Sequence, residues 1–311
     1  MNIGKVPGNV LKRSVVNLIG KGPRTGVDSA VLKQGNEFIL SATGVGLVNS
    51  EIAPQLAVYK ACNNIWAAGG EVYGVEAAFM LSEKTKERVL KELTRKTMHA
   101  CRMCNTELSG GHTEVSDCVN RAISTVVAVG SAKNKPRDVR DIKPGMDIVM
   151  TKWAGLEEAA ILIHNEEAYA RLKERFSEYY LDGFGNYEDW LTVREEACVA
   201  AEFQNVVMHD NSEGGVFGSL WDMAEGSGLG FDIDLRAIPL RQEIIEIACL
   251  FELNIYRMKS SGSLLIVCED GKAMVEALNK AEIPAACIGR FTDNNDKLIR
   301  NEDEIRYLER V

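Results

Sequence analysis

The sequence lacks the features of membrane, secreted and fibrous proteins. Its 311 residues contain no uninterrupted apolar run of the ~18–20 residues that a membrane span requires. Lys12 and Arg13 fall where a secretory signal peptide needs its apolar segment. The 7 prolines are too few for a proline-rich chain, and no low-complexity tract is present. We therefore expect a folded, water-soluble, cytoplasmic protein that does not enter a membrane.

Positive charge and paired cysteines are also scarce. The chain has 36 Lys+Arg against 45 Asp+Glu, a net charge of -9, which repels a phosphate backbone and disfavours nucleic acid as a partner. The 8 cysteines are scattered, without the dense framework of small secreted domains, which indicates reduced thiols. Cys101 and Cys104 form the only close pair, on the apolar side of an expected helix over 83–105. Core packing is one interpretation, and a metal or redox role is the other, although one pair supplies half a structural zinc site.

The order of expected elements indicates an α/β or α+β protein. The length suggests about two domains at ~100–200 residues each. The polar segment 133–145, which carries two prolines, predicts a connection, with domains over 1–150 and 151–311. Strands are expected at 37–42, 72–81, 122–129, 147–151, 230–233 and 263–267, and helices at 55–68, 83–105, 156–174, 192–203, 214–225 and 271–280.

Glycine pairs beside polar residues are the motifs that could carry chemistry. Ser109–Glu114 (SGGHTE) could approach a phosphate through its glycines, or form an ordinary tight turn. Met208–Gly215 (MHDNSEGG) precedes an expected helix, whose first N–H groups suit an anion, while His209 and Asp210 suit acid–base or metal chemistry. The alternative is a helix start capped by Asn211 or Ser212. Two further segments, 151–155 (TKWAG) and 259–263 (KSSGS), are composed of residues used both in turns and in phosphate loops.

Taken in order, these motifs resemble the aminoimidazole-ribonucleotide synthetase superfamily, and most closely its hydrogenase-maturation carbamoyl dehydratase-like, "synthetase-related" branch. The resemblance spans essentially the whole chain. It rests on GKVP at 4–7, GVDSA at 26–30, GGHTEV at 110–115, TKWAGLE at 151–157, HDNSEGG at 209–215 and SSGSLLI at 260–266.

The resemblance implies a two-domain α/β fold whose N-terminal strands pair across a homodimer to form a β-barrel. It implies magnesium-ATP as cofactor, bound in the cleft between the domains and used to phosphorylate a substrate oxygen. A hydrogenase-maturation protein is a further expected partner. It assigns Asp28 and Glu114 to the metal, leaves His209 and Asp210 as catalytic candidates, and assigns to the cofactor Asn64, Gly110, Gly111, His112, Thr113, Lys152, Gly155, Glu213, Gly214 and Gly215.

Several positions depart from the family pattern. Gly44 and Asn64 stand where the family has carboxylates, and magnesium prefers anionic oxygen ligands. Glu158 stands where a glycine is usual, and the last cysteine is Cys287, whereas the carbamoyl dehydratase carries its substrate on a C-terminal cysteine. Three functions stay open. The first is an ATP-dependent enzyme with an altered, unidentified substrate, and the second is a non-catalytic paralogue that binds a ligand or partner as a homodimer. The third is a direct part in hydrogenase maturation, with a partner that delivers the substrate.

Overall fold

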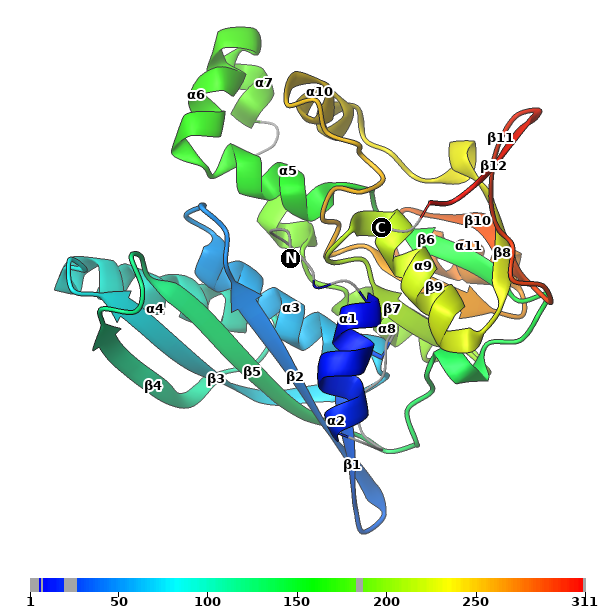
Figure 1. The fold of residues 1–311 in the computed structure, drawn as a ribbon, viewed down its shortest axis with the longest axis horizontal. Helices are drawn as coiled ribbons and strands as arrows, with labels where there is room; N and C mark the ends of the chain where they lie inside the picture. Colours follow the sequence, from blue (N-terminus) through cyan, green and yellow to red (C-terminus); the bar gives the residue numbers. More distant parts are fainter. Residues whose placement is uncertain (1–5, 7, 20–26, 183–186, 310–311) are drawn as a thin grey trace.

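A computed structural model describes residue 6 and residues 8–19, 27–182 and 187–309 (Figure 1). Residues 4, 5, 7 and 26 of the sequence motifs lie outside the described residues. The described chain forms two mixed β-sheets, each with helices packed against it, and this confirms the expected α/β architecture. The first sheet ends at Ala132 and the second begins at Asp147. The domain boundary at 150 itself stays a prediction.

The first sheet has the strand order β1-β2-β5-β3-β4. β3 and β4 pair in parallel and the other neighbours are antiparallel. The strands are β1 (Ala30–Gln34), β2 (Glu37–Gly46), β3 (Glu71–Ser82), β4 (Leu108–Ser116) and β5 (Ile123–Ala132). The helices of this half are α1 (Gly8–Leu11), η1 (Lys12–Val16), α2 (Asn17–Ile19), α3 (Ala53–Ala67) and α4 (Glu87–Met103).

The helix α3 lies close against the sheet. Pro54 stands in its first turn, where a missing N–H costs nothing, and almost every side of the helix is buried. A Cβ built on Gly44 would lie 1.9 Å from the carbonyl oxygen of Ala57, and one on Gly46 would lie 2.3 Å from that of Ala53. Glycine at these two positions of β2 therefore permits the close packing of strand on helix.

The second sheet has the order β12-β11-β8-β10-β6-β9-β7, in which β11 and β8 are parallel. Its strands are β6 (Asp147–Thr151), β7 (Val207–Asp210), β8 (Gly230–Asp234), β9 (Leu264–Cys268), β10 (Ala285–Thr292), β11 (Lys297–Asn301) and β12 (Glu304–Tyr307). Its helices are η2 (Val139–Asp141), α5 (Leu156–Ile163), α6 (Glu166–Arg175), α7 (Glu178–Asp182), η3 (Tyr187–Trp190), α8 (Arg194–Ala200), α9 (Gly215–Ser227), η4 (Leu235–Ala237), α10 (Gln242–Leu250) and α11 (Gly271–Lys280).

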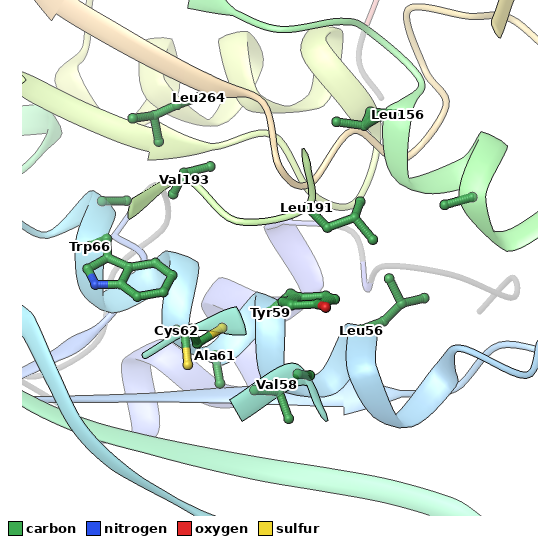
Figure 2. Close-up of a cluster of buried hydrophobic side chains, with 14 of the residues drawn as sticks. Leu56, Val58, Tyr59, Ala61, Cys62, Trp66, Leu156, Leu191, Val193 and Leu264 are labelled. Carbon is green, nitrogen blue, oxygen red and sulfur yellow. The ribbon is translucent and has the colours of Figure 1, made fainter. Parts of the chain in front are cut away.

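One hydrophobic core joins the two halves. Along β9, Leu264 and Ile266 belong to a cluster that also contains most of the buried side chains of α3, whereas Leu265 belongs to a second cluster with α9. Figure 2 shows Leu56, Tyr59 and Trp66 of α3 facing residues of the second half, among them Leu191, Val193 and Leu264. Because burial of apolar area stabilises this contact, the two halves are held in one arrangement.

Two local interpretations were wrong. Of the two offered for 109–114, the tight turn is excluded, because these glycines lie inside β4, which pairs with β3 at the edge of the first sheet. The helix expected over 156–174 is two helices, because the side chain of Asn165 accepts a hydrogen bond from the N–H of Ala168 (2.8 Å) and caps α6.

Cys101 and Cys104 are both buried with free thiols, as the apolar spacing predicted. Both side chains belong to the hydrophobic cluster that also contains α3, so these cysteines pack in the core. Across the described ranges no helix is long and apolar enough to cross a bilayer.

Candidate functional site

The carboxylate of Asp28 joins the first half of the chain to the end of β7. Its Oδ1 lies 2.6 Å from Nδ1 of His209, and its Oδ2 accepts a hydrogen bond from the backbone N–H of Asp210 (3.2 Å). The side chains of Asp28 and His209 are each only 10% exposed, so solvent screens this contact weakly. The structure thus brings together three residues that the sequence motifs singled out.

Asp210 is the most deeply buried carboxylate of this group. Oδ2 accepts a hydrogen bond from Oγ of Ser261 (2.9 Å), and that Oγ in turn accepts one from Nδ2 of Asn63 on α3 (3.2 Å). Oδ1 has no hydrogen-bond partner among the residues that the structure describes. Burial, and next the neighbouring charge of Asp28, raise the pKa of Asp210 to about 7. Near neutral pH this group is therefore able both to give and to take a proton.

A chain of ion pairs lies beside Asp210. Nζ of Lys60 on α3 lies 2.7 Å from Oε1 of Glu157 and 3.0 Å from Oε1 of Glu213. Nζ of Lys259 lies 3.2 Å from the same oxygen of Glu213. Glu157 also contributes to the raised pKa of Asp210, so the ion pairs and Asp28, His209 and Asp210 form one electrostatic group. We call these seven residues the junction cluster.

Glycine and serine residues hold the loops of the junction cluster in place. Gly215 has a φ of 62°, and a Cβ there would lie 2.3 Å from the carbonyl oxygen of Met258. Gly155 has a φ of 78° and donates its N–H to Oγ of Ser260 (2.8 Å). The N–H of Ser260 donates to the carbonyl oxygen of Asn211 (2.9 Å). The small residues that the motifs contain are therefore required for loops that pack directly on one another.

The structure places most of the predicted site residues in two regions, the junction cluster with its loops and the edge strand β4. Asp28, His209, Asp210 and Glu213 belong to the junction cluster, and Gly155, Gly214 and Gly215 shape its loops. The residues from β4 are exposed on the edge strand, away from the cluster. They are Gly110, Gly111, His112, Thr113 and Glu114.

Lys152 and Asn64 do not join the junction cluster through any contact among the described residues. The ammonium group of Lys152 lies 2.6 Å from Oε1 of Glu196 and donates to the carbonyl oxygens of Trp190 (2.9 Å) and Thr192 (2.5 Å). These three acceptors engage the ammonium group of Lys152 within the second half. Asn64 lies half-buried on α3.

The sequence motifs did not predict that Lys60 of α3 belongs to the junction cluster. Lys60 is the one charged residue of α3, a helix in which nearly every residue is buried, and a lysine in such a position must find a buried counter-ion. Asn63 donates Nδ2 to the carbonyl oxygen of Leu191 (2.9 Å), and its Oδ1 accepts from the N–H of Val193 (3.1 Å). The buried lysine was the signal that could have placed α3 against the motifs of the second half.

The residues expected to hold magnesium do not fit a magnesium site within one chain. Both oxygens of Asp28 are already engaged by His209 and Asp210. Glu114 lies on β4, whereas Asp28 precedes β1, which forms the opposite edge of the five-stranded sheet. Gly44 offers no side chain, and the described residues hold no group of three metal-ligating side chains.

Two family models match the chain. The AIR synthase related protein N-terminal domain matches residues 26–132, and the corresponding C-terminal domain matches residues 143–300. A selenide, water dikinase from Treponema denticola is 22% identical, over 79% of this chain and 76% of that protein.

Solved structures of 16–17% identity share the fold. A chain from a HypE–HypF complex superposes with a TM-score of 0.78 at 16% identity and covers 98% of this chain and 100% of that one. HypE in complex with ATP gives a TM-score of 0.74 at 16% identity, covering 100% of this chain and 96% of that one. AaThiL complexed with AMPPCP and TMP gives 0.75 at 17% identity, covering 96% of each.

Proposed function

Because the chain belongs to the AIR synthase-related protein family, we propose that it binds ATP and transfers a phosphoryl group to an oxygen of a small substrate. Similar proteins were solved with ATP and with AMPPCP, which supports a nucleotide as the ligand. The observation that carries the proposal is the buried Asp210. Its Oδ1 finds no hydrogen-bond partner in the described part of the chain, and its pKa is raised, which is typical of a reactive group rather than a structural one.

The proposal gives each part of the junction cluster a role. Asp210 exchanges a proton with the substrate oxygen, and Asp28 orients His209 beside it. Glu213 and Gly214 lead into α9, where the N–H groups of Gly215 and Phe217 already donate to the carbonyl oxygens of Ser212 (3.2 Å) and Tyr256 (3.1 Å), so backbone hydrogen bonds hold the start of this helix in place. Phosphorylation of the substrate oxygen converts it into a leaving group, after which ring closure or dehydration follows. Since the expected magnesium ligands do not assemble in one chain, no step is assigned to a metal.

A non-catalytic paralogue is the second candidate function. Gly44 favours it, because β2 contacts α3 so closely there that the carboxylate typical of the family has no room. In this alternative the junction cluster binds a ligand without turnover, and its charges stabilise the contact between the two halves.

The proposal includes a homodimer formed through the first sheet. The helices α3 and α4 cover one face of that sheet, and residues of β5 alternate between buried and more exposed positions. Val129, near the end of β5, is 39% exposed. A second chain that covers this face would complete a β-barrel and bring β4, with Glu114, against new neighbours. A partner protein is also proposed, because one similar chain comes from a HypE–HypF complex.

Phosphoryl transfer is tested by comparing Asp210→Asn with the unaltered protein. ATP binding is measured by calorimetry, and ADP formation is measured on the same samples with candidate small-molecule acceptors. An enzyme loses ADP formation in Asp210→Asn by about a hundredfold or more while it still binds ATP. Equal ADP formation by both proteins would remove Asp210 from the chemistry. ATP binding without ADP formation in either protein would favour the non-catalytic alternative.

A further inference from the structure

Two lysines from opposite halves of the chain converge on one carboxylate oxygen. Nζ of Lys60 lies 3.0 Å and Nζ of Lys259 lies 3.2 Å from Oε1 of Glu213. Two ammonium groups around one anionic oxygen are the arrangement that proteins use for phosphate groups. Glu213 therefore occupies a position that suits the oxygen of an anionic ligand.

The exposure of the side chains shows which of them can move. Lys60 keeps a second counter-ion, because Glu157 lies 2.7 Å away and its side chain is fully buried. Glu213 is 35% exposed and Lys259 is 25% exposed. The carboxylate of Glu213 can thus turn toward solvent while Lys60 stays paired with Glu157.

The backbone that carries these groups is held in place. Gly215, two residues after Glu213, packs on the carbonyl oxygen of Met258, which directly precedes Lys259. The carbonyl oxygen of Lys259 accepts a hydrogen bond from the N–H of Glu158 (2.9 Å). The ammonium groups of Lys60 and Lys259 therefore stay close to each other when the side chain of Glu213 turns toward solvent.

The charges around this position favour replacement of Glu213 by a stronger anion. Burial disfavours the ionisation of Glu213, yet Lys60 and Lys259 hold the pKa of Glu213 below its ordinary value. Glu213 is therefore ionised at neutral pH. Glu158 also faces Lys259; burial raises the pKa of Glu158, and the charge of Lys259 opposes that shift. With Glu213 turned away, Lys60 keeps Glu157 as its counter-ion at 2.7 Å, and Lys259 loses the carboxylate oxygen that it contacts at 3.2 Å. An anionic ligand restores that contact.

We propose that Lys60 and Lys259 bind a phosphate group of the ligand, and that Glu213 occupies this position until the ligand displaces it. The identification of the phosphate as part of a nucleotide rests on the proposed function. The lysine pair then supplies positive charge that the missing carboxylate–magnesium ligands do not. Glu213 lowers the affinity of the resting protein for phosphate, because every phosphate must displace it.

Calorimetric titration of inorganic phosphate into Glu213→Ala and Glu213→Gln tests the site. Glu276→Gln is the matched control, since it makes the same charge change at a residue 69% exposed on α11. We expect both Glu213 variants to bind phosphate about fivefold more tightly than the control, the factor that one partly exposed ion pair contributes. Lys259→Gln, compared with Lys272→Gln at a residue 88% exposed, weakens phosphate binding by a similar factor. Phosphate affinities that match those of the controls overturn the site.

Titration of ATP into the same proteins separates this inference from the proposed function. If every variant binds ATP and the phosphate affinities equal those of the controls, the lysine site is overturned and the proposed function stands. If Glu213→Ala binds phosphate more tightly but no protein binds ATP, the lysine site is supported and a nucleotide is excluded as its ligand. No binding of either ligand by any variant overturns both.

Discussion

At the scale of single residues, the fold buries charges and pairs them. Lys60 with Glu157 and Lys152 with Glu196 are lysine–glutamate pairs in which each glutamate is at most 2% exposed. Burial raises the pKa of Glu196, while Lys152 opposes that shift. A buried pair adds little net stability over apolar residues of the same size, but the loss of one partner leaves an unpaired buried charge.

Lys152→Met is therefore expected to lower the free energy of unfolding by about 3–5 kcal/mol. Urea unfolding followed by circular dichroism measures the loss. The double variant Lys152→Met/Glu196→Leu recovers much of it, because the orphaned carboxylate is gone. A single variant as stable as the unaltered protein would contradict the structural role given to Lys152.

The raised pKa of Asp210 predicts that the free energy of unfolding depends on pH. Its pKa is about 7 in the folded protein and ~3.9 in the unfolded chain, so between these values the folded state holds the extra proton. The contribution of Asp210 to the free energy of unfolding consequently falls as pH rises from about 4 to about 7, and it stays constant above pH 7. The asparagine of Asp210→Asn does not titrate. The free energy of unfolding of this variant, relative to that of the unaltered protein, therefore rises between about pH 4 and pH 7, by an amount on the order of a few kcal/mol. A stability difference that is the same at pH 5 and pH 8 would refute the shift.

At the scale of elements, periodicity predicted those with a strong apolar pattern. The strand at 147–151 and the helix at 271–280 have the bounds expected. β4 was missed because its SGGHTE sequence has few β-formers and its pairing with β3 is a tertiary effect. The position of Gly44 against α3 was equally hidden, since a glycine in a strand does not reveal which backbone approaches it.

The motifs identified part of the candidate site. The HDNSEGG glycines open α9 as expected, and His209 and Asp210 lie side by side at the end of β7. Lys60 was not predicted, because its partners are about 100 and 150 residues away in sequence. Contacts of that range depend on how the two halves pack, which local patterns do not contain.

The contact between β2 and α3 predicts that a family carboxylate cannot be restored at position 44. Gly44→Asp places its Cβ against the carbonyl oxygen of Ala57, and we expect a loss of about 3 kcal/mol or more, or a failure to fold. Asn64→Asp adds the same charge at a half-buried position and is expected to be tolerated. Thermal unfolding of both variants measures the difference, and equal melting temperatures would mean that the contact is looser than described.

At the scale of the whole molecule, the shared core makes the junction cluster a fixed site. The apolar residues of α3 pack against those of the second half, and the charged residues lie at the same contact. A ligand that binds there would stabilise both halves together.

The proposed dimer gives a second prediction at this scale. Val129→Glu puts a charge on the open face of the first sheet and is expected to convert a dimer into a monomer in analytical ultracentrifugation. Val89→Glu is the matched control, because Val89 is also 39% exposed but lies on α4, which belongs to the layer that covers the opposite face. Dimers in both variants would exclude this face from the dimer contact.

The central claim is that the junction cluster binds a nucleotide, and calorimetric titration of ATP into the purified protein, with and without magnesium, tests it most directly. The account predicts saturable binding of one ATP per chain, retained without magnesium and weakened by Lys259→Gln. A folded protein that takes up no ATP under either condition would contradict it.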